Sequence, residues 1–160
     1  MATEPIWNTI QAALVAALGA IRKSNNSAYW YDVKAVYESD QEQWDKSKLP
    51  ALVILQVPTQ STRKNAGGSN TVMGTLTYVI KAAIKRDPAS ETAPARLCYR
   101  LVADIHRALT AEQGLGISGV KRVTFPSEPA LDDAALAGKD AVIGFVYPLS
   151  VEYSFNEKTP

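Results

Sequence analysis

The sequence is poor in the residues on which metal sites, disulfide-bonded folds and many enzymes depend. Its 160 residues include one cysteine, Cys98, and one histidine, His106. A single cysteine excludes a disulfide framework and a cysteine-based zinc site within the chain. A single imidazole excludes any site that needs two histidines from one chain. We therefore expect no metal and no cofactor.

Charge of one sign and long apolar runs are also lacking. Seventeen basic residues face sixteen acidic ones, a net charge of +1, whereas a nucleic-acid-binding module needs a strongly basic face. The apolar stretch Ala12–Ile21 is about half of the roughly twenty residues that a membrane span requires. The first residues lack the basic region of a signal peptide. These absences predict a soluble intracellular protein with no membrane contact.

What the chain does contain is enough apolar material for one ordinary core. Hydrophobic residues make up 46% of the sequence, and a chain of this length buries roughly 68–70% of its surface on folding. No repeat and no long linker divides it. We expect a single domain over residues 1–155, followed by a polar tail over 156–160.

Two segments have the 3.6-residue apolar period of a helix. The first has its stripe from Ile6 to Ile21, with Thr3 predicted as the N-cap. The second runs from Ser90 or Thr92 to about Gln113, with Gly114 predicted as the C′ residue. Its apolar face consists of Ala93, Leu97, Leu101, Ile105, Ala108 and Leu109, flanked by Cys98 and Val102.

Five segments have the pattern of strands, and loops connect them. Leu49–Val57 is apolar throughout and is predicted to be covered on both faces. Pro148 interrupts the last strand on its polar face, which predicts an edge position or a bulge. The predicted strands are Ala28–Glu38, Leu49–Val57, Thr71–Lys85, about Gly119–Phe125 and Ile143–Phe155. The predicted loops are Ser39–Lys48, a mobile hairpin loop over Thr59–Asn70, and Pro126–Asp140.

The element order is therefore α-β-β-β-α-β-β. Helices that are segregated from a run of strands are typical of the α+β class. We predict a mostly antiparallel sheet with the two main helices packed on one face, and no doubly wound nucleotide-binding fold.

Catalytic chemistry finds little support in the sequence. His106 lies near the end of the second predicted helix, where the helix dipole alone favours it. Cys98 lies eight residues away on the same helix, a rise of roughly 12 Å, which is too far for a thiolate–imidazole pair. No serine stands in a nucleophile-elbow motif. We interpret Cys98 as a small core residue.

Other candidate sites are equally weak. Asp132 and Asp133 are neighbours in a loop without the spacing of a calcium site. Gly67 and Gly68 precede a strand, whereas a phosphate cradle needs helix amides after its glycines. A few basic residues could contact a phosphate backbone, but they are too few for a dedicated interface; they are Arg63, Lys64, Lys81 and Lys85.

The remaining signal is apolar surface that a small domain cannot bury. Two helices cover only one face of a sheet, yet Val79 adds apolar surface to the other face of its strand. Trp7 lies at the margin of the first helical stripe, Trp30 in the first strand, and Trp44 in a polar loop. We predict that these four residues contribute to an interface between subunits or with a partner.

Taken in order, these segments resemble a known family. The residues are the Trp44-Asp45 pair, the Leu-Pro-Ala-Leu-Val run of Leu49–Val53, the helix Leu101–Thr110, the Leu115-Gly116 turn and the terminal Val-Glu-Tyr-Ser-Phe of Val151–Phe155. With the order and size of the elements over nearly the whole chain, they are similar to the tail terminator, or tail completion, proteins of long-tailed bacteriophages.

The resemblance implies a structural virion protein without catalytic residues, assembled in the host cytoplasm and located in the tail or neck. Such proteins form a homo-oligomeric ring, six-fold in the family, which caps the tail tube, stops its growth and meets the head–tail connector proteins. A family loop can project into the lumen where genomic DNA passes. The Thr59–Asn70 loop is the candidate here, with Arg63 and Lys64 lining the channel.

Other readings stay open at this point. Another neck or head-completion protein, or a tail-tube subunit, would have similar small α+β segments. A small ligand-binding or enzymatic α+β module would need a pocket with convergent polar groups, and His106 would have to line it.

Overall fold

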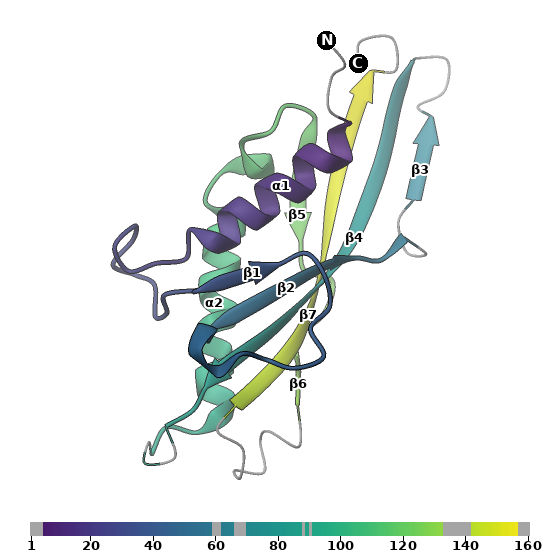
Figure 1. Cartoon of the computed structure of the whole chain (residues 1–160). Helices are drawn as coiled ribbons and strands as arrows, with labels where there is room; N and C mark the ends of the chain where they lie inside the picture. The colour runs from purple at the N-terminus through teal and green to yellow at the C-terminus, as the bar shows by residue number, and fades with distance from the viewer. Residues whose placement is uncertain are drawn as a thin grey trace.

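A computed structural model describes residues 5–58, 62–65, 70–87, 89, 91–132 and 142–156. The described residues form two α-helices, seven strands and short 3₁₀ turns (Figure 1). In chain order they are α1 (Ile6–Gly19), β1 (Ala35–Tyr37), η1 (Lys46–Lys48), β2 (Ala51–Gln56), β3 (Thr62–Asn65), β4 (Thr71–Lys85), α2 (Pro94–Thr110), η3 (Gln113–Gly116), β5 (Val120–Thr124), β6 (Ala130–Leu131) and β7 (Val142–Asn156).

The predicted α+β class is confirmed. One mixed sheet has the strand order β1-β2-β4-β7-β5, with β3 added to β4 and β6 added to β7. All pairings are antiparallel except that of β1 with β2, which is parallel. The observed order contains the predicted one and adds two short strands, β3 and β6, within segments predicted as loops.

Two 15-residue strands form the spine of the molecule. β4 and β7 pair in unbroken register from Thr71 opposite Asn156 to Lys85 opposite Val142. In Figure 1 they run diagonally through the whole structure, with β3 beside their upper half and β6 at their lower end. β2 pairs with the lower half of β4, and β5 with the upper half of β7. The long pair thus has different neighbours at its two ends.

Alternation along these strands gives the sheet two different faces. Even-numbered residues of β4 from Leu76 to Ile84 and odd-numbered residues of β7 from Ile143 to Tyr153 are buried in one cluster with both helices. The helices contribute the following buried side chains: Ile10, Leu14 and Leu18 from α1, and Cys98, Leu101, Ile105 and Leu109 from α2. We call this side of the sheet the covered face.

The opposite side, which we call the open face, is covered by neither α1 nor α2. A loop covers only one corner, where Trp44 and Leu49 pack against Ala51 and Ala83. β2 therefore has four consecutive buried residues, Ala51–Ile54, as predicted for a strand covered on both faces. Elsewhere the open face carries mostly half-buried and exposed side chains, although Thr77 is buried.

The helix ends differ from the predictions. α1 begins at Ile6, with Pro5 at the N-cap position and its carbonyl oxygen accepting from the amides of Asn8 and Thr9. The predicted cap, Thr3, lies outside the described residues. α2 ends at Thr110 instead of Gln113, so Gly114, with φ of 61°, belongs to the η3 turn.

The predicted strand Ala28–Glu38 is wrong over most of its length, because only Ala35–Tyr37 pairs in the sheet. The residues before it bond to a helix instead: the amides of Trp30 and Tyr31 donate to the carboxylate of Asp104 on α2. The alternation of apolar residues gives no sign that a buried carboxylate, and not a neighbouring strand, accepts the backbone hydrogen bonds of this segment.

Pro148 does not interrupt the pairing of β7 with β4, where it lies opposite Val79 in unbroken register, so the predicted bulge is absent there. On its other side β7 is a local edge. β5 pairs only as far as Ser150 and β6 only from Val146, which leaves Pro148 in the gap between them. A residue without an N–H is tolerated where no neighbouring strand needs that donor.

The loop predictions are corrected in part. Thr62–Asn65 forms β3, paired with β4, so Arg63 and Lys64 lie on an edge strand instead of a loop tip. Ala130–Leu131 forms β6 within the predicted Pro126–Asp140 loop. Gly67, Gly68 and Asp133 lie outside the described residues, as do 157–160 of the predicted tail, and the predicted mobility of residues 59–70 stays a prediction.

Candidate interaction surface

The open face changes in character from one end to the other, as the strand register shows. Near β1 and β6 the face is mostly apolar: Val79 lies between Leu55 and Pro148, and in the next row Val146 lies opposite the charged Lys81. Further up, hydroxyl groups follow, and the last rows are charged. The polar and charged members are Thr75, Thr77, Ser150, Thr124, Glu152, Arg122 and Lys64. A surface with an apolar part and a polar rim is typical of a protein–protein interface.

A groove of about 460 Å³ lies in the apolar half of the open face. Trp44 and Gln41 line one side, and Leu131 and Asp132 of the β6 segment line the other. Val146, which is 38% exposed, and Gly144 belong to its floor. We call this the lower groove. Lys81 also lines it and pairs with Asp40 through a 2.6 Å contact between Nζ and Oδ2.

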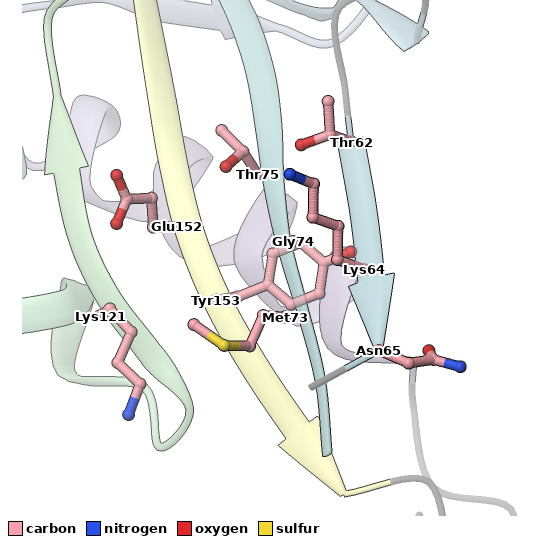
Figure 2. Close-up of a pocket in the computed structure, with 9 residues that line it drawn as sticks. All are labelled: Thr62, Lys64, Asn65, Met73, Gly74, Thr75, Lys121, Glu152 and Tyr153. Atoms are coloured by element: carbon pink, nitrogen blue, oxygen red, sulfur yellow. The ribbon is translucent and has the colours of Figure 1, made fainter. Parts of the chain in front are cut away.

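A second groove, of about 360 Å³, lies in the charged half (Figure 2). Lys64 of β3 and Lys121 of the β5 strand flank it, and Met73 of β4, 49% exposed, lies between them. Glu152 reaches into the same region and accepts a 2.7 Å hydrogen bond from Arg122. We call this the upper groove; its two flanking lysines give it a basic character.

Behind the covered face, the outer side of α2 carries a third surface. The guanidinium carbon of Arg100 lies 4.4 Å from the centroid of the Trp30 ring, and Trp30 is 52% exposed. Tyr99, next to Arg100 on the helix, is 49% exposed. Arg96 lies one turn before Arg100 and is exposed. We call Trp30, Arg96, Tyr99 and Arg100 the aromatic knob.

The knob is held from beneath by Asp104, a fully buried carboxylate. Its oxygens accept from the amides of Trp30 and Tyr31 at 2.9–3.1 Å, and Arg107 contacts it at 3.3 Å while also donating to the carbonyl of Ala28. Burial raises the pKa of Asp104 from its ordinary value, although the two amides and Arg107 act in the opposite direction. The carboxylate thus ties residues 28–31 to α2.

The four predicted interface residues lie in four different places. Trp7 on α1 is 40% exposed and meets Phe155 edge to face at 6.4 Å. Trp30 belongs to the aromatic knob, and Trp44 is half-buried at the lower groove. Val79 is half-buried in the middle of the open face. Trp44 and Val79 lie on the open side of the sheet, and Trp7 and Trp30 lie on the covered side, so the four do not form one patch.

Arg63 and Lys64 are both exposed on β3, but alternation sends their side chains to opposite faces of the sheet. Arg63 lies over the ring of Phe155, 5.7 Å from its centroid, on the covered side. Lys64 lies at the upper groove. Their placement toward a channel stays a prediction.

His106 and Cys98 do not meet in a pocket. His106 is exposed on α2 and stacks on Phe125 with ring centroids 4.6 Å apart, and Phe125 in turn stacks on Tyr147. His106 lines neither of the two grooves. Cys98 is buried in the core, and burial raises the pKa of its thiol to about 11. A thiol with such a pKa is a poor nucleophile at neutral pH.

Within the described ranges, no three His, Cys, Asp or Glu side chains gather closely enough to hold a metal ion. Among the same residues, no helix is long and apolar enough to cross a membrane.

Sequence reasoning missed Asp104 and the three α2 residues of the knob. Asp104 occupies the apolar stripe between Leu101 and Ile105, and a carboxylate in that position signals a buried partner. Arg96 and Arg100 are one helical turn apart, and Tyr99 stands between them. That spacing was available in the sequence, whereas the proximity of Trp30 was not.

No protein-family model matches the sequence, and no curated protein matches it. Among solved structures, the chain is similar to the sheath/tube terminator of an extracellular contractile injection system, PVC, in its extended state. The sequence identity is 16%, the TM-score is 0.48 and the match covers 98% of this chain. The chain spans 59% of the length of that protein. A likeness of this identity and score assigns no function to the present chain.

Proposed function

We propose that this protein is a non-enzymatic structural subunit of a phage tail or a related tail-like particle. Copies of it assemble into a ring that caps the tail tube, ends tube growth and contacts the connector on the head side. The proposal starts from the residues that resemble tail terminators, from Trp44-Asp45 to Val151–Phe155. In the family that the sequence resembles, the ring has six copies.

The observation that carries the proposal is the open face of the sheet. Val79, Leu55 and Pro148 form a half-buried apolar row, and Val146 is 38% exposed beside them. Both helices pack on the other side, so the described residues leave this row only half-buried. Apolar surface with a polar rim is what a subunit offers to its neighbour. In a closed ring each subunit presents two different faces, and the sheet and the helices supply two such faces.

The first experiment measures the native mass of the purified protein by sedimentation over a concentration series. We expect one discrete closed species, with about six copies if the ring follows the family. Open-ended growth would contradict a terminator and favour a tube subunit. A monomer at every concentration would contradict ring formation by the chain alone.

A second part of the proposal concerns β3. We propose that this edge strand faces the lumen of the ring, with Arg63 and Lys64 near the DNA. The double variant Arg63→Glu/Lys64→Glu should keep the fold and the native mass, because both side chains are exposed. It should weaken binding of a duplex DNA fragment to the assembled species at low salt, since each lost phosphate contact lowers affinity. Unchanged DNA binding would contradict this placement.

A further inference from the structure

The aromatic knob exposes two large rings that the fold does not need on its surface. Trp30 is 52% exposed and contacts Arg100, and Tyr99, the residue before Arg100 on α2, is 49% exposed. Tryptophan, tyrosine and arginine are the residue types that dominate binding energy in protein interfaces. A single exposed aromatic ring is ordinary, but two rings around a stacked arginine form a contiguous surface of interface composition.

Hydrogen bonds tie the Trp30 part of the knob to α2 within the single chain. The amide of Trp30 donates to both oxygens of Asp104, at 3.1 and 2.9 Å, and the hydroxyl of Tyr31 donates to the carbonyl of Leu97 at 3.1 Å. The guanidinium group of Arg100 stacks on the ring of Trp30. Because these contacts already order the segment, docking of the knob loses little further conformational entropy.

The knob is also cationic. Arg96 and Arg100 take part in none of the ion pairs formed within the described part of the chain. Asp104, the one acidic residue of α2, is fully buried and contacts Arg107. The surface that a partner meets is therefore positive, and it favours a partner surface that carries carboxylates.

The lower groove has the matching shape. Its floor includes Gly144, whose missing side chain deepens it, and Val146 beside it supplies apolar contact. A Cβ at Gly144 would lie 2.9 Å from the carbonyl oxygen of Ala82, so the position admits no ordinary side chain. The groove, at about 460 Å³, is large enough to take an aromatic side chain. Burial of such a side chain removes about 150–250 Å² of surface from water.

The lower groove also has the matching charge. The segment Glu38–Asp45 carries four carboxylates and no basic residue, and it borders the groove through Gln41 and Trp44. Lys81 inside the groove is neutralised by Asp40. Glu42 next to Gln41, and Asp132 on the opposite wall, are exposed. The lower groove therefore has acidic residues around an apolar floor, and the aromatic knob has basic residues beside two aromatic rings. The charges of the two surfaces are complementary.

We propose that the aromatic knob of one copy docks into the lower groove of the next copy of this chain. The knob lies outside α2, behind the covered face, whereas the groove lies on the open face, so one chain cannot satisfy both. A head-to-tail contact between copies can, and it leaves a free knob and a free groove at the two ends for further copies. This inference rests on the proposed ring and names the contact that would build it.

Two variants of the full chain test the contact, each of which removes one side. The knob variant is Trp30→Ala/Arg100→Glu, and the groove variant is Val146→Arg. The control is Ala12→Arg, which places the same charge at an exposed apolar residue of α1, outside the knob and both grooves. Circular dichroism and urea unfolding first establish that all three fold.

Sedimentation then compares the variants with the wild-type chain. Each variant alone should associate about 30-fold more weakly or worse, the loss typical of a removed hot spot, while the control assembles like wild type. An equimolar mixture of the two variants should form a dimer of two chains and nothing larger, because only one intact knob and one intact groove remain to meet.

The outcomes separate this inference from the proposed function. A closed wild-type ring that persists unchanged in both folded variants would overturn the knob-and-groove contact and leave the ring standing. Monomeric variants whose mixture gives no dimer would also overturn it. A wild-type chain that stays monomeric up to about 1 mM would overturn both ring and contact.

Discussion

The two faces of the sheet are made by the same strands, and the two α-helices cover only one of them. Ile80 and Val79 are neighbours on β4, and both are β-branched residues that favour a strand. Ile80 is fully buried under the helices, whereas Val79 stays half-buried on the open face. At this pair of positions, residue type does not distinguish the covered face from the open face; the position of the helices does.

The largest effect is expected on the covered side, at the carboxylate that ties residues 28–31 to α2. Asp104→Ala leaves two amides and Arg107 without their acceptor in a buried site. Removing one partner of such a buried set costs about 3–5 kcal/mol of unfolding free energy, measurable by urea unfolding.

The control for Asp104 is Asp32, an exposed carboxylate that accepts a 2.7 Å hydrogen bond from the amide of Lys23. Asp32→Ala should cost no more than about 1 kcal/mol, because water replaces the lost acceptor. Equal losses at the two positions would mean that burial does not set the strength of these bonds.

The neighbouring pair on β4 compares the faces directly. Ile80→Ala should cost about 2–5 kcal/mol, since it leaves a cavity in the packed core. Val79→Ala should cost less than about 1 kcal/mol in the isolated chain, because its side chain has few neighbours to lose. Urea unfolding of both variants at a concentration below assembly measures the difference. Equal costs would contradict the description of this face as open.

A smaller effect should appear when pH changes. The pKa of Asp104 is raised in the fold, chiefly because burial disfavours the charged carboxylate. The folded chain then binds this proton more tightly than the unfolded chain. The resulting contribution to the unfolding free energy is complete below the pKa of an unfolded aspartate, about 3.9, and is lost as pH rises through the folded pKa. The unfolding free energy of wild type minus that of Asp104→Asn should therefore be larger at about pH 3.5 than at about pH 7.

The opposite result would be that the difference in unfolding free energy between wild type and Asp104→Asn is smaller at low pH. Two amides and Arg107 favour the ionised carboxylate, and if they outweighed burial the difference would shrink on acidification. Urea unfolding of both proteins at the two pH values decides which of the two effects is stronger.

The long strands could be predicted from the sequence because each has a face buried along its whole length. β4 was predicted with its observed bounds, and β7 within one residue at each end. Period-two alternation is reliable where one side packs on a continuous core. The helical stripes of α1 and α2 were predicted for the same reason, with errors confined to their ends.

The remaining features depend on contacts between distant residues. Trp30 and Asp104 are 74 residues apart, and their hydrogen bond removes residues 28–31 from the sheet. Arg63 and Lys64 are polar, so nothing in their pattern signals a strand; β3 forms because β4 extends beyond β2 and offers a free edge. The knob and the lower groove each combine segments that only the fold brings together.

The smallest effect is expected for the ion pair of the open face, Arg122 with Glu152. Its contact of 2.7 Å is shorter than the 3.3 Å between Arg107 and Asp104, yet both of its side chains are substantially exposed. Water screens an exposed pair, so a double-mutant cycle with Arg122→Ala and Glu152→Ala should give a coupling free energy of no more than about 1 kcal/mol. At about 1 M salt, where the screening length is about 3 Å, the coupling should vanish.

If a neighbouring copy covers this end of the open face, the same cycle repeated in the assembled state should retain its coupling at high salt, because burial excludes the screening ions. Equal salt sensitivity in both states would place this end of the face in water, with the apolar half alone in contact with the neighbour.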